Sequence, residues 1–262
     1  MTSPANFPKK RLGQHFLKDP NTARIVTAGV TQEDVVLEIG PGHGFLTAFL
    51  AQKARLVHAV ELDPDVFPVL RRAVRGSDNV RIHVGDALRF DYGALDPVPN
   101  KLVANLPYNV ASPLVLMLLE GTPYLDSLRF MVQLEVARRM AAGRGTKDYG
   151  AYAVLVQLLA RVRIVHRVSP SVFDPPPRVY SAVVQMERLR RGLEPAEYAG
   201  VKRLVLAAFR SRRKRLVNNL PEPVRGEAPR VLSSLGPGPD ARAEELTPED
   251  FVALYRAMSW AL

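Results

Sequence analysis

A chain of 262 residues is long for one domain and short for two, so we expect one larger domain and a small appendage. Hydrophobic residues make up 47% of it, which argues against disorder, and the lack of cysteine excludes a disulfide scaffold, a thiolate metal site and a cysteine nucleophile. The 36 Lys and Arg outnumber the 26 Asp and Glu by ten, which favours an anionic partner such as nucleic acid over a merely solvated basic surface.

The termini and the apolar runs bear on where the protein works. The first 18 residues carry positive charge but no apolar segment of the kind found in signal peptides. No run approaches the ~18 apolar residues of a membrane span, so we expect a soluble, cytoplasmic protein that does not enter a membrane. The five His have no metal-ligand spacing, so we expect no metal.

Strand-like apolar runs alternate with helical patterns through the first two thirds of the chain. The expected strands span 35–39, 56–60, 80–84, 101–104 and 128–132, and the expected helices between them span 44–52, 64–75 and 113–120. Such alternation predicts βαβ units and an α/β fold with a doubly wound, mostly parallel sheet. Residues 154–165 and 182–189 are candidates for two closing strands, the first with a helical portion.

The composition changes near Arg190–Gly192, so we divide the chain into a domain of residues 1–192 and a small helical C-terminal domain of residues 193–262. In the second domain we expect a long helix over 198–220, Pro/Gly-rich loops over 221–229 and 236–239, and a last helix over 248–262. Residues 199–220 carry seven Lys and Arg and no acid, whereas residues 221–262 carry four basic and seven acidic residues.

The first strand leads into a glycine-rich turn that contains Gly40, Gly42 and Gly44. Glycine tolerates positive φ angles and lets a ligand approach the backbone. Glu61 ends the second strand, where it can accept hydrogen bonds from both hydroxyls of a ribose, and Asp86 ends the third, where it can accept from an adenine amine. NAD would explain the glycines and Glu61, but the spacing is G-x-G-x-G and not the G-x-G-x-x-G of dinucleotide binding. The pattern therefore favours S-adenosylmethionine over NAD. For Asp86, the structural alternative to a ligand contact is a helix N-cap.

The fourth strand ends in Asn105-Leu106-Pro107-Tyr108. The exocyclic amine of adenine is a poor nucleophile because its lone pair is delocalised into the ring. The Asn105 side-chain oxygen and the Leu106 carbonyl can accept hydrogen bonds from its two N–H groups. These bonds draw the nitrogen toward a tetrahedral form. Tyr108 offers a ring that stacks a base, worth roughly 1–3 kcal/mol, and that stabilises positive charge passing from sulfur to nitrogen. The tetrapeptide therefore predicts amine methylation, with a proline turn as the alternative.

The chain resembles the ribosomal RNA adenine N6,N6-dimethyltransferases over nearly its whole length. The resemblance rests on residues 10–17 (KRLGQHFL), 38–42 (EIGPG), 105–109 (NLPYN) and 173–179 (FDPPPRV, with Arg178 where the family has Lys). It implies a Rossmann-like class I methyltransferase that uses S-adenosylmethionine as methyl donor. The residues that it places at the cofactor are His15, Leu17, Gly40, Glu61, Asp86 and Asn105. By the same resemblance, Tyr108 and Phe173 sandwich the target adenine.

Two branches of this family compete. One dimethylates two adjacent adenosines near the 3′ end of small-subunit (16S) ribosomal RNA during ribosome biogenesis, and the other modifies large-subunit RNA and confers antibiotic resistance. Residues 208–220 (AFRSRRKRLVNNL) and 242–246 (RAEEL) are similar to the first branch, which we expect here, acting on the small ribosomal subunit as a monomer. A non-catalytic assembly factor that has kept the fold is a further alternative, opposed by the intact residues 105–108.

The predicted basic helix is the candidate RNA contact of the second domain. Arg210, Lys214 and Arg215 fall on its polar arc, where they are expected to reach phosphates. Arg212 and Arg213 fall in the gap of the apolar stripe, so one of them is a candidate for a structural, ion-paired arginine. A solvated basic face is the alternative for the whole helix.

Overall fold

The computed structural model describes residues 14–190, 193–222 and 224–258. These residues form two compact units. The first holds the described residues up to Ala137 together with Val162–Arg188, and the second holds Arg138–Arg161 and the described residues from Leu189 onward. In the described part of the chain, no helix has the length and apolar character needed to cross a membrane.

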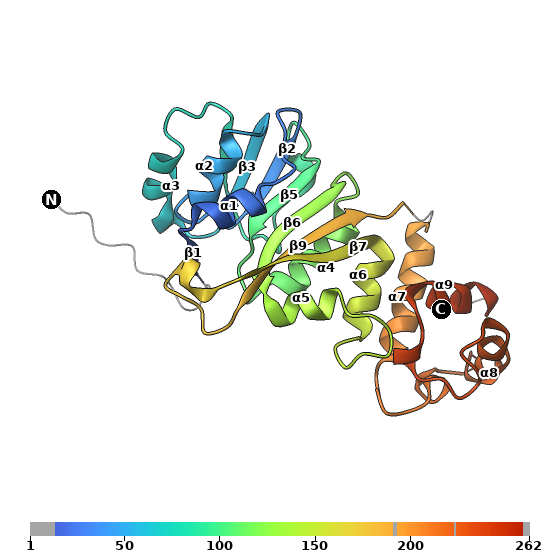
Figure 1. Ribbon diagram of the computed structural model, residues 1–262. Helices are drawn as coiled ribbons and strands as arrows, with labels where there is room; N and C mark the ends of the chain where they lie inside the picture. Colours follow the sequence, from blue (N-terminus) through green and yellow to red (C-terminus); the bar gives the residue numbers. More distant parts are fainter. Residues whose placement is uncertain (1–13, 191–192, 223, 259–262) are drawn as a thin grey trace. The chain divides into compact units, whose positions relative to one another are not determined.

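The first unit is built around a seven-stranded sheet in the order β4-β3-β2-β5-β6-β9-β7 (Figure 1). Its strands are β2 (Val35–Ile39), β3 (Leu56–Glu61), β4 (Val80–Val84), β5 (Lys101–Asn105), β6 (Ser127–Gln133), β7 (Ala160–Val168) and β9 (Ser181–Arg188). Strands β2 to β6 pair in parallel, whereas β9 pairs antiparallel with β6. The predicted doubly wound, mostly parallel sheet is confirmed, including the two closing strands.

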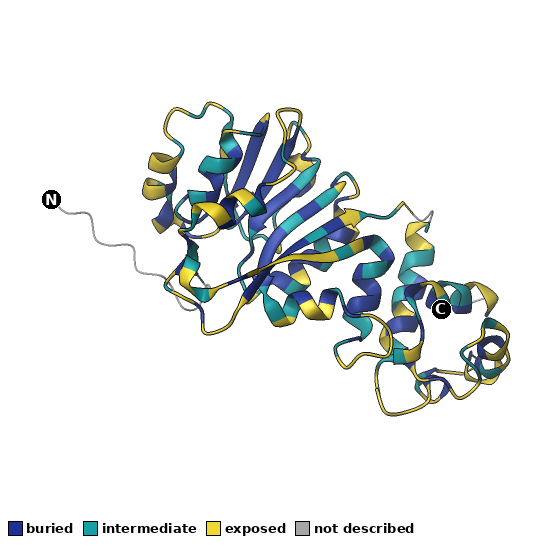
Figure 2. Cartoon of the chain, in the orientation of Figure 1, coloured by how far each residue is buried: buried dark blue, intermediate teal, exposed yellow. Residues whose placement is uncertain are grey.

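Helices cover both faces of this sheet. They are α1 (Pro20–Val26), α2 (Phe45–Ala51), α3 (Phe67–Ala73), α4 (Ala111–Gly121) and α5 (Leu134–Met140). Apolar side chains of α1 and α2 pack in one cluster with Val36, Val57 and Val103 of the sheet, and α4 lies on the opposite face (Figure 1). Because both faces are covered, β2 is buried at every position (Figure 2), and its sequence is an almost unbroken apolar run.

The strand order reverses between β2 and β5. From β2 the chain proceeds outward through β3 to β4, and then returns to β5 on the other side of β2. Ligands of open α/β sheets bind outside the carboxyl ends of the strands at such a point. Gly40 directly follows β2 and Asn105 ends β5, so the fold brings these two predicted site residues to the reversal point.

A separate two-stranded sheet joins two distant segments of the first unit. Strand β1 (Phe16–Leu17) pairs antiparallel with β8 (Phe173–Asp174), with Leu17 opposite Phe173. The amide of Lys18 also donates to the carbonyl of Val172 at 2.9 Å. The segment around His15 is therefore tied to the proline-rich segment that follows Phe173.

The second unit contains α6 (Ala151–Leu159), α7 (Pro195–Ala208), α8 (Val224–Leu235) and α9 (Pro248–Ala257). Its division from the first unit differs from the composition change at residue 192, because residues 138–161 group with the C-terminal helices. The Tyr149 hydroxyl donates to the carbonyl of Leu246 at 2.8 Å, and the amide of Gly145 donates to the carbonyl of Glu244 at 2.8 Å. These bonds link residues far apart in sequence, and a change in composition along the chain does not reveal such contacts.

The long helix predicted over 198–220 is wrong, because α7 ends at Ala208. The Asn219 side chain donates to the carbonyls of Ala208 and Ser211, at 2.7 and 3.1 Å, and so bonds the carbonyl at the helix end. A short 3-10 turn over Leu216–Asn219 then folds back. Arg210, Lys214 and Arg215 consequently lie in a loop and its turn, not on the polar arc of a helix.

The loop predicted over 221–229 is also wrong, since α8 begins at Val224 and contains Pro229. Val224, Ala228, Val231 and Leu232 are buried at helical spacing, and α8 packs against α9. Burial of this apolar face outweighs the unfavourable proline, as tertiary contacts commonly outweigh local propensity. The helix predicted over 248–262 is confirmed for Pro248–Ala257, and residues 259–262 lie outside the described part.

Candidate active site

The glycine turn between β2 and α2 adopts positive φ at Gly40 (70°) and Gly42 (54°). A Cβ on Gly42 would lie 2.8 Å from the ring of Phe16, and one on Gly40 would lie 3.3 Å from Pro107. The positive φ values predicted for this turn are confirmed, and close contacts give a second reason for glycine there. Two other segments of the protein lie directly against the turn, and all four of these residues line one pocket.

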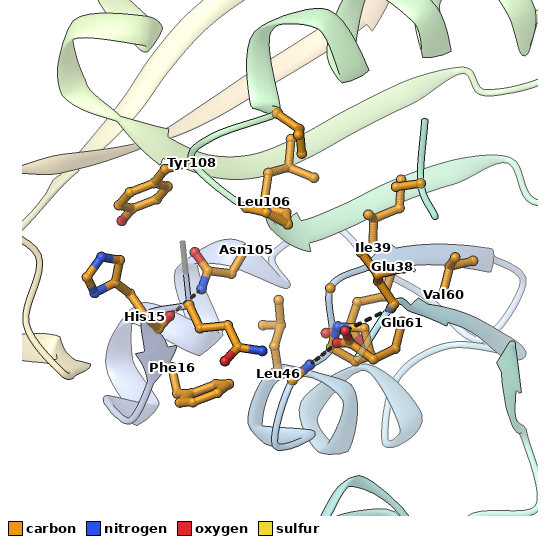
Figure 3. Close-up of a pocket in the computed structure, with 18 of the residues that line it drawn as sticks. His15, Phe16, Glu38, Ile39, Leu46, Val60, Glu61, Asn105, Leu106 and Tyr108 are labelled. Atoms are coloured by element: carbon orange, nitrogen blue, oxygen red, sulfur yellow. Dashed lines mark hydrogen bonds between the residues drawn. The ribbon is translucent and has the colours of Figure 1, made fainter. Parts of the chain in front are cut away.

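Glu61, at the end of β3, points toward this pocket from a buried position (Figure 3). Its Oε1 accepts from the amides of Leu62 and Asp63 at 2.9 and 2.8 Å, and its Oε2 accepts from Gly42 at 3.0 Å. Burial raises the pKa of Glu61, and these backbone hydrogen bonds oppose that rise. Three bonds orient the carboxylate and leave about one lone-pair position for a ligand hydroxyl.

Glu38 lines the same pocket from β2, although it is not among the residues predicted to contact the cofactor. It is 1% exposed, and its Oε2 has no hydrogen-bond partner in the described part of the chain. Burial raises the pKa of Glu38 to about 8, with repulsion from Glu61 adding to the rise. A buried carboxyl with one unpartnered oxygen favours a ligand that brings positive charge or a hydrogen-bond donor.

Asp86 also lines the pocket, two residues after β4. Its Oδ1 accepts from the amide of Leu88 at 3.0 Å. The segment is a turn and no helix begins there, so the helix N-cap alternative is not realised. Asp86 therefore lies at the pocket, and its role as acceptor from a ligand amine stays a prediction.

Asn105 carries the clearest orientation in the pocket. Its Nδ2 donates to the backbone carbonyl of His15 at 3.0 Å (Figure 3). Since a carbonyl only accepts, this bond fixes which end of the amide points where. The Oδ1 of Asn105 is buried and without a partner among the described residues. A preoriented acceptor therefore lies at the end of β5, where the predicted chemistry requires one.

Leu106 and Tyr108 complete the loop after β5. The amide of Leu106 donates to the carbonyl of Met131 at 3.2 Å, which anchors the loop to β6. The hydroxyls of Tyr108 and Ser181 share a hydrogen bond of 2.5 Å, and burial raises the pKa of Tyr108 to about 12. The Tyr108 ring lies beside that of His15, with centroids 5.4 Å apart. The phenol is therefore neutral and fixed at both its ring and its hydroxyl.

Phe173 does not line the pocket. It is fully buried in the cluster that contains Leu17 and the apolar side chains of α1 and α2. Its pairing with Leu17 places it in the small β1–β8 sheet. In this arrangement no face of Phe173 is available to a base held against Tyr108, and the sandwich stays a prediction from the resemblance.

The segment over residues 14–17 brings further residues to the pocket. Of the predicted cofactor contacts, His15 and Leu17 both line it, and the Nδ1–H of His15 donates to the carbonyl of Pro175 at 2.8 Å. Phe16, not anticipated from sequence, stacks on His43 with ring centroids 3.7 Å apart. No periodic pattern marks this short segment, although its place inside the 10–17 motif was an available signal. Residues 10–13 of that motif lie outside the described part.

The predicted RNA-contacting residues belong to the second unit and differ in their partners. Arg212 donates to Glu244 Oε2 at 2.6 Å and to the carbonyls of Lys147 and Thr146, so it is the structural arginine that the pattern anticipated. Arg215 is ion-paired with Asp240. Arg210 and Lys214 are exposed and line one groove with Arg225. No cluster of three potential metal ligands occurs in the described ranges.

A nucleoside-binding edge without a phosphate loop, next to an oriented acceptor for an amine, places the first unit among class I methyltransferases. Solved structures agree with that class. A dimethyladenosine transferase from Plasmodium falciparum is similar with a TM-score of 0.80 at 27% identity, over 92% of this chain and 96% of that one. The 23S rRNA methyltransferase ErmE has a TM-score of 0.74 at 28% identity, over 94% of this chain and 100% of that one.

Sequence comparison identifies the family within this class. The family model described as Ribosomal RNA adenine dimethylase matches residues 5–259, and the chain belongs to that family. A Rubrobacter xylanophilus protein named Ribosomal RNA small subunit methyltransferase A is 73% identical over 96% of this chain and 95% of that protein. A protein of the same name from Methylococcus capsulatus is 37% identical over 97% of this chain and 99% of that protein. The family predicted from the motifs is confirmed.

Proposed function

We propose that this chain transfers methyl groups from S-adenosylmethionine to the N6 amines of two adjacent adenosines near the 3′ end of small-subunit ribosomal RNA. The observation that carries the proposal is the orientation of Asn105. Its amide nitrogen is bound to His15, so its unpartnered oxygen is held ready to accept from an amine. The names of the relatives from Rubrobacter xylanophilus and Methylococcus capsulatus support the small subunit as the target.

The pocket residues fit S-adenosylmethionine, which supplies an activated methyl group on a sulfonium cation when bound. Glu61 is oriented by three amides and retains acceptor capacity for a ribose hydroxyl. Asp86 has an oxygen left for the adenine amine of the same ligand. The unpartnered Oε2 of Glu38 suits a ligand that carries positive charge and ammonium donors. These three residues would hold the methyl donor.

The loop after β5 would act on the acceptor adenosine. The Asn105 oxygen and the Leu106 carbonyl accept hydrogen bonds from the two N–H groups of the amine and so free its lone pair. Tyr108 is held in place by Ser181, and its ring supports the base and stabilises developing positive charge. These contacts strengthen as the nitrogen becomes tetrahedral, and interactions of that kind raise the rate.

The substrate has consequences for where the protein works. Action on ribosomal RNA during ribosome biogenesis would take place in the cytoplasm, and the chain would act as a monomer. A large-subunit target is the second candidate, because ErmE shares most of the fold. We favour the small subunit because relatives named for it are up to 73% identical to this chain.

Mass spectrometry of ribosomal RNA from a deletion strain tests the proposal. We expect two adjacent dimethyladenosines to disappear from 16S RNA and to return with the wild-type gene but not with Asn105→Ala. Loss of a modification from 23S RNA would favour the second candidate. Unchanged ribosomal RNA of both subunits would contradict both.

A further inference from the structure

Arg167 and Tyr180 form an exposed stacked pair at one edge of the sheet. The guanidinium carbon of Arg167 lies 3.8 Å from the centroid of the Tyr180 ring, and Tyr180 is 45% exposed. Arg167 lies near the end of β7, the last strand in the sheet order, and most of that strand faces solvent (Figure 2). Neither residue lines the pocket of the first unit.

The charge of Arg167 is not neutralised by a carboxylate in the described part of the chain. Arg163, on the same strand and also exposed, makes an ion pair with Glu187 at 2.9 Å. The two arginines therefore differ in kind: one is paired, and the other rests on a ring. A guanidinium stacked on an aromatic face keeps its in-plane N–H donors available, and those donors match two oxygens of a phosphate.

The pair adjoins the loop that would hold the target base. Tyr180 immediately precedes Ser181, whose hydroxyl binds that of Tyr108 at 2.5 Å. The carbonyl of Tyr180 also accepts from the amide of Leu134 at 2.9 Å, which fixes its backbone next to β6. Consecutive Cα atoms are about 3.8 Å apart, so the backbone that carries the stack lies next to the residue that holds Tyr108.

We propose that the Arg167–Tyr180 stack binds a backbone phosphate of the RNA strand beside the target adenosine. The proposal rests on the proposed function for its RNA substrate. Tyr180 holds the guanidinium in one plane, so less freedom is lost when the phosphate binds. Arg178, exposed and two residues before Tyr180, adds positive charge to the same strand path. Arg167 does not touch the reacting atoms in this proposal, so it is a positioning residue that acts through alignment of the strand.

The test compares Arg167→Ala with Arg163→Ala, which removes the same charge from the same strand but from an existing ion pair. RNA affinity of the full chain is measured across a salt series with a 16S RNA fragment, together with KM and kcat for methylation. We expect Arg167→Ala to shrink the slope of log K against log salt by about 0.7–0.9 and to raise KM for RNA. We expect kcat at saturating RNA and affinity for S-adenosylmethionine to stay unchanged, and Arg163→Ala to match wild type.

Two further variants separate a phosphate contact from a structural role. Tyr180→Phe keeps the ring and should retain the wild-type slope and KM, whereas Tyr180→Ala should behave like Arg167→Ala. If Arg167→Ala lowers the thermal midpoint, Arg167→Gln, which keeps most of the side-chain stem, replaces it in the comparison.

A wild-type slope and KM in folded Arg167→Ala or Arg167→Gln would overturn the proposal. RNA affinity is measured without methyl donor, so this result is separable from failure of the proposed function. That failure would appear as a wild-type protein that binds RNA and leaves its adenosines unmethylated.

Discussion

The side-chain amide of Asn105 uses its nitrogen to bind the protein and keeps its oxygen for the substrate. Asn105→Ala removes one of the two acceptors for an amine that must become tetrahedral. We expect single-turnover methylation to fall on the order of 10²-fold or more, by analogy with the loss of a preorganised hydrogen-bonding group. RNA affinity should stay near wild type, because the loss belongs to the chemical step.

A matched control for Asn105 is Asn21→Ala, which removes an exposed amide of α1 outside the pocket. That variant should methylate at the wild-type rate. A wild-type rate in Asn105→Ala would show that the loop after β5 is only a structural turn.

The raised pKa of Glu38 makes the stability of the ligand-free protein depend on pH. Its pKa is raised from an ordinary value of 4.5 to about 8, chiefly by burial. Folding therefore favours the protonated acid, so its contribution to stability is present below pH 4.5 and is lost as pH rises toward 8. Glu38→Gln is neutral at every pH. We expect this variant to be more stable than wild type at pH 8, by an amount on the order of a few kcal/mol, and close to wild type near pH 4.5.

Thermal unfolding of wild type and Glu38→Gln at several pH values measures this dependence. The difference in stability between the two proteins should grow steadily from acid to alkaline pH. A constant difference across the range would mean that folding does not raise the pKa of Glu38.

At the scale of elements, the glycine turn and strand β1 lie directly against each other. Phe16 of β1 occupies the space where Gly42 lacks a side chain. We expect Gly42→Ala to displace Phe16, to weaken binding of S-adenosylmethionine, and to lower stability by about 1–3 kcal/mol through overpacking. Calorimetry with the methyl donor and thermal unfolding measure the two effects.

Gly29→Ala separates crowding from backbone strain. Gly29 has a φ of 79°, a positive value like that of Gly42, but a Cβ added to it would meet no atom within 4 Å. This variant carries the backbone strain without the collision, so its affinity for the methyl donor should equal that of wild type. Equal losses in both variants would show that strain alone, and not contact with Phe16, makes glycine necessary at position 42.

At the scale of the whole molecule, an excess of ten positive charges favours binding to RNA. Its distribution is more informative than its sum, because many cations are already paired. Arg210 and Lys214 share a groove and have no carboxylate partner in the described ranges, whereas Arg256 binds Glu197 at 2.6 Å. We expect the double variant Arg210→Ala/Lys214→Ala to shrink the salt slope of RNA binding by roughly 1.4–1.8. Arg256→Ala should leave the slope unchanged, and an unchanged slope in the folded double variant would show that the groove is merely solvated.

The sequence by itself determined the doubly wound sheet and most of the pocket. Period and composition are local properties, so the buried runs that became β2, β3 and β4 could be recognised without the rest of the chain. Gly40, Glu61 and Asn105 follow or end strands, and the carboxyl ends of parallel strands meet at one edge. Their convergence therefore follows from the order of elements alone.

Only the tertiary structure decided the features that depend on contacts between distant segments. Asn219 ends the predicted long helix early by bonding the carbonyl of Ala208, and the pattern of apolar residues contains no trace of that bond. The burial of Phe173 depends on its pairing with Leu17, 156 positions away. The stacking of Arg167 on Tyr180 likewise depends on which strands become neighbours. Periodicity reports which side of an element is apolar, whereas the partner of each side chain is set by packing in three dimensions.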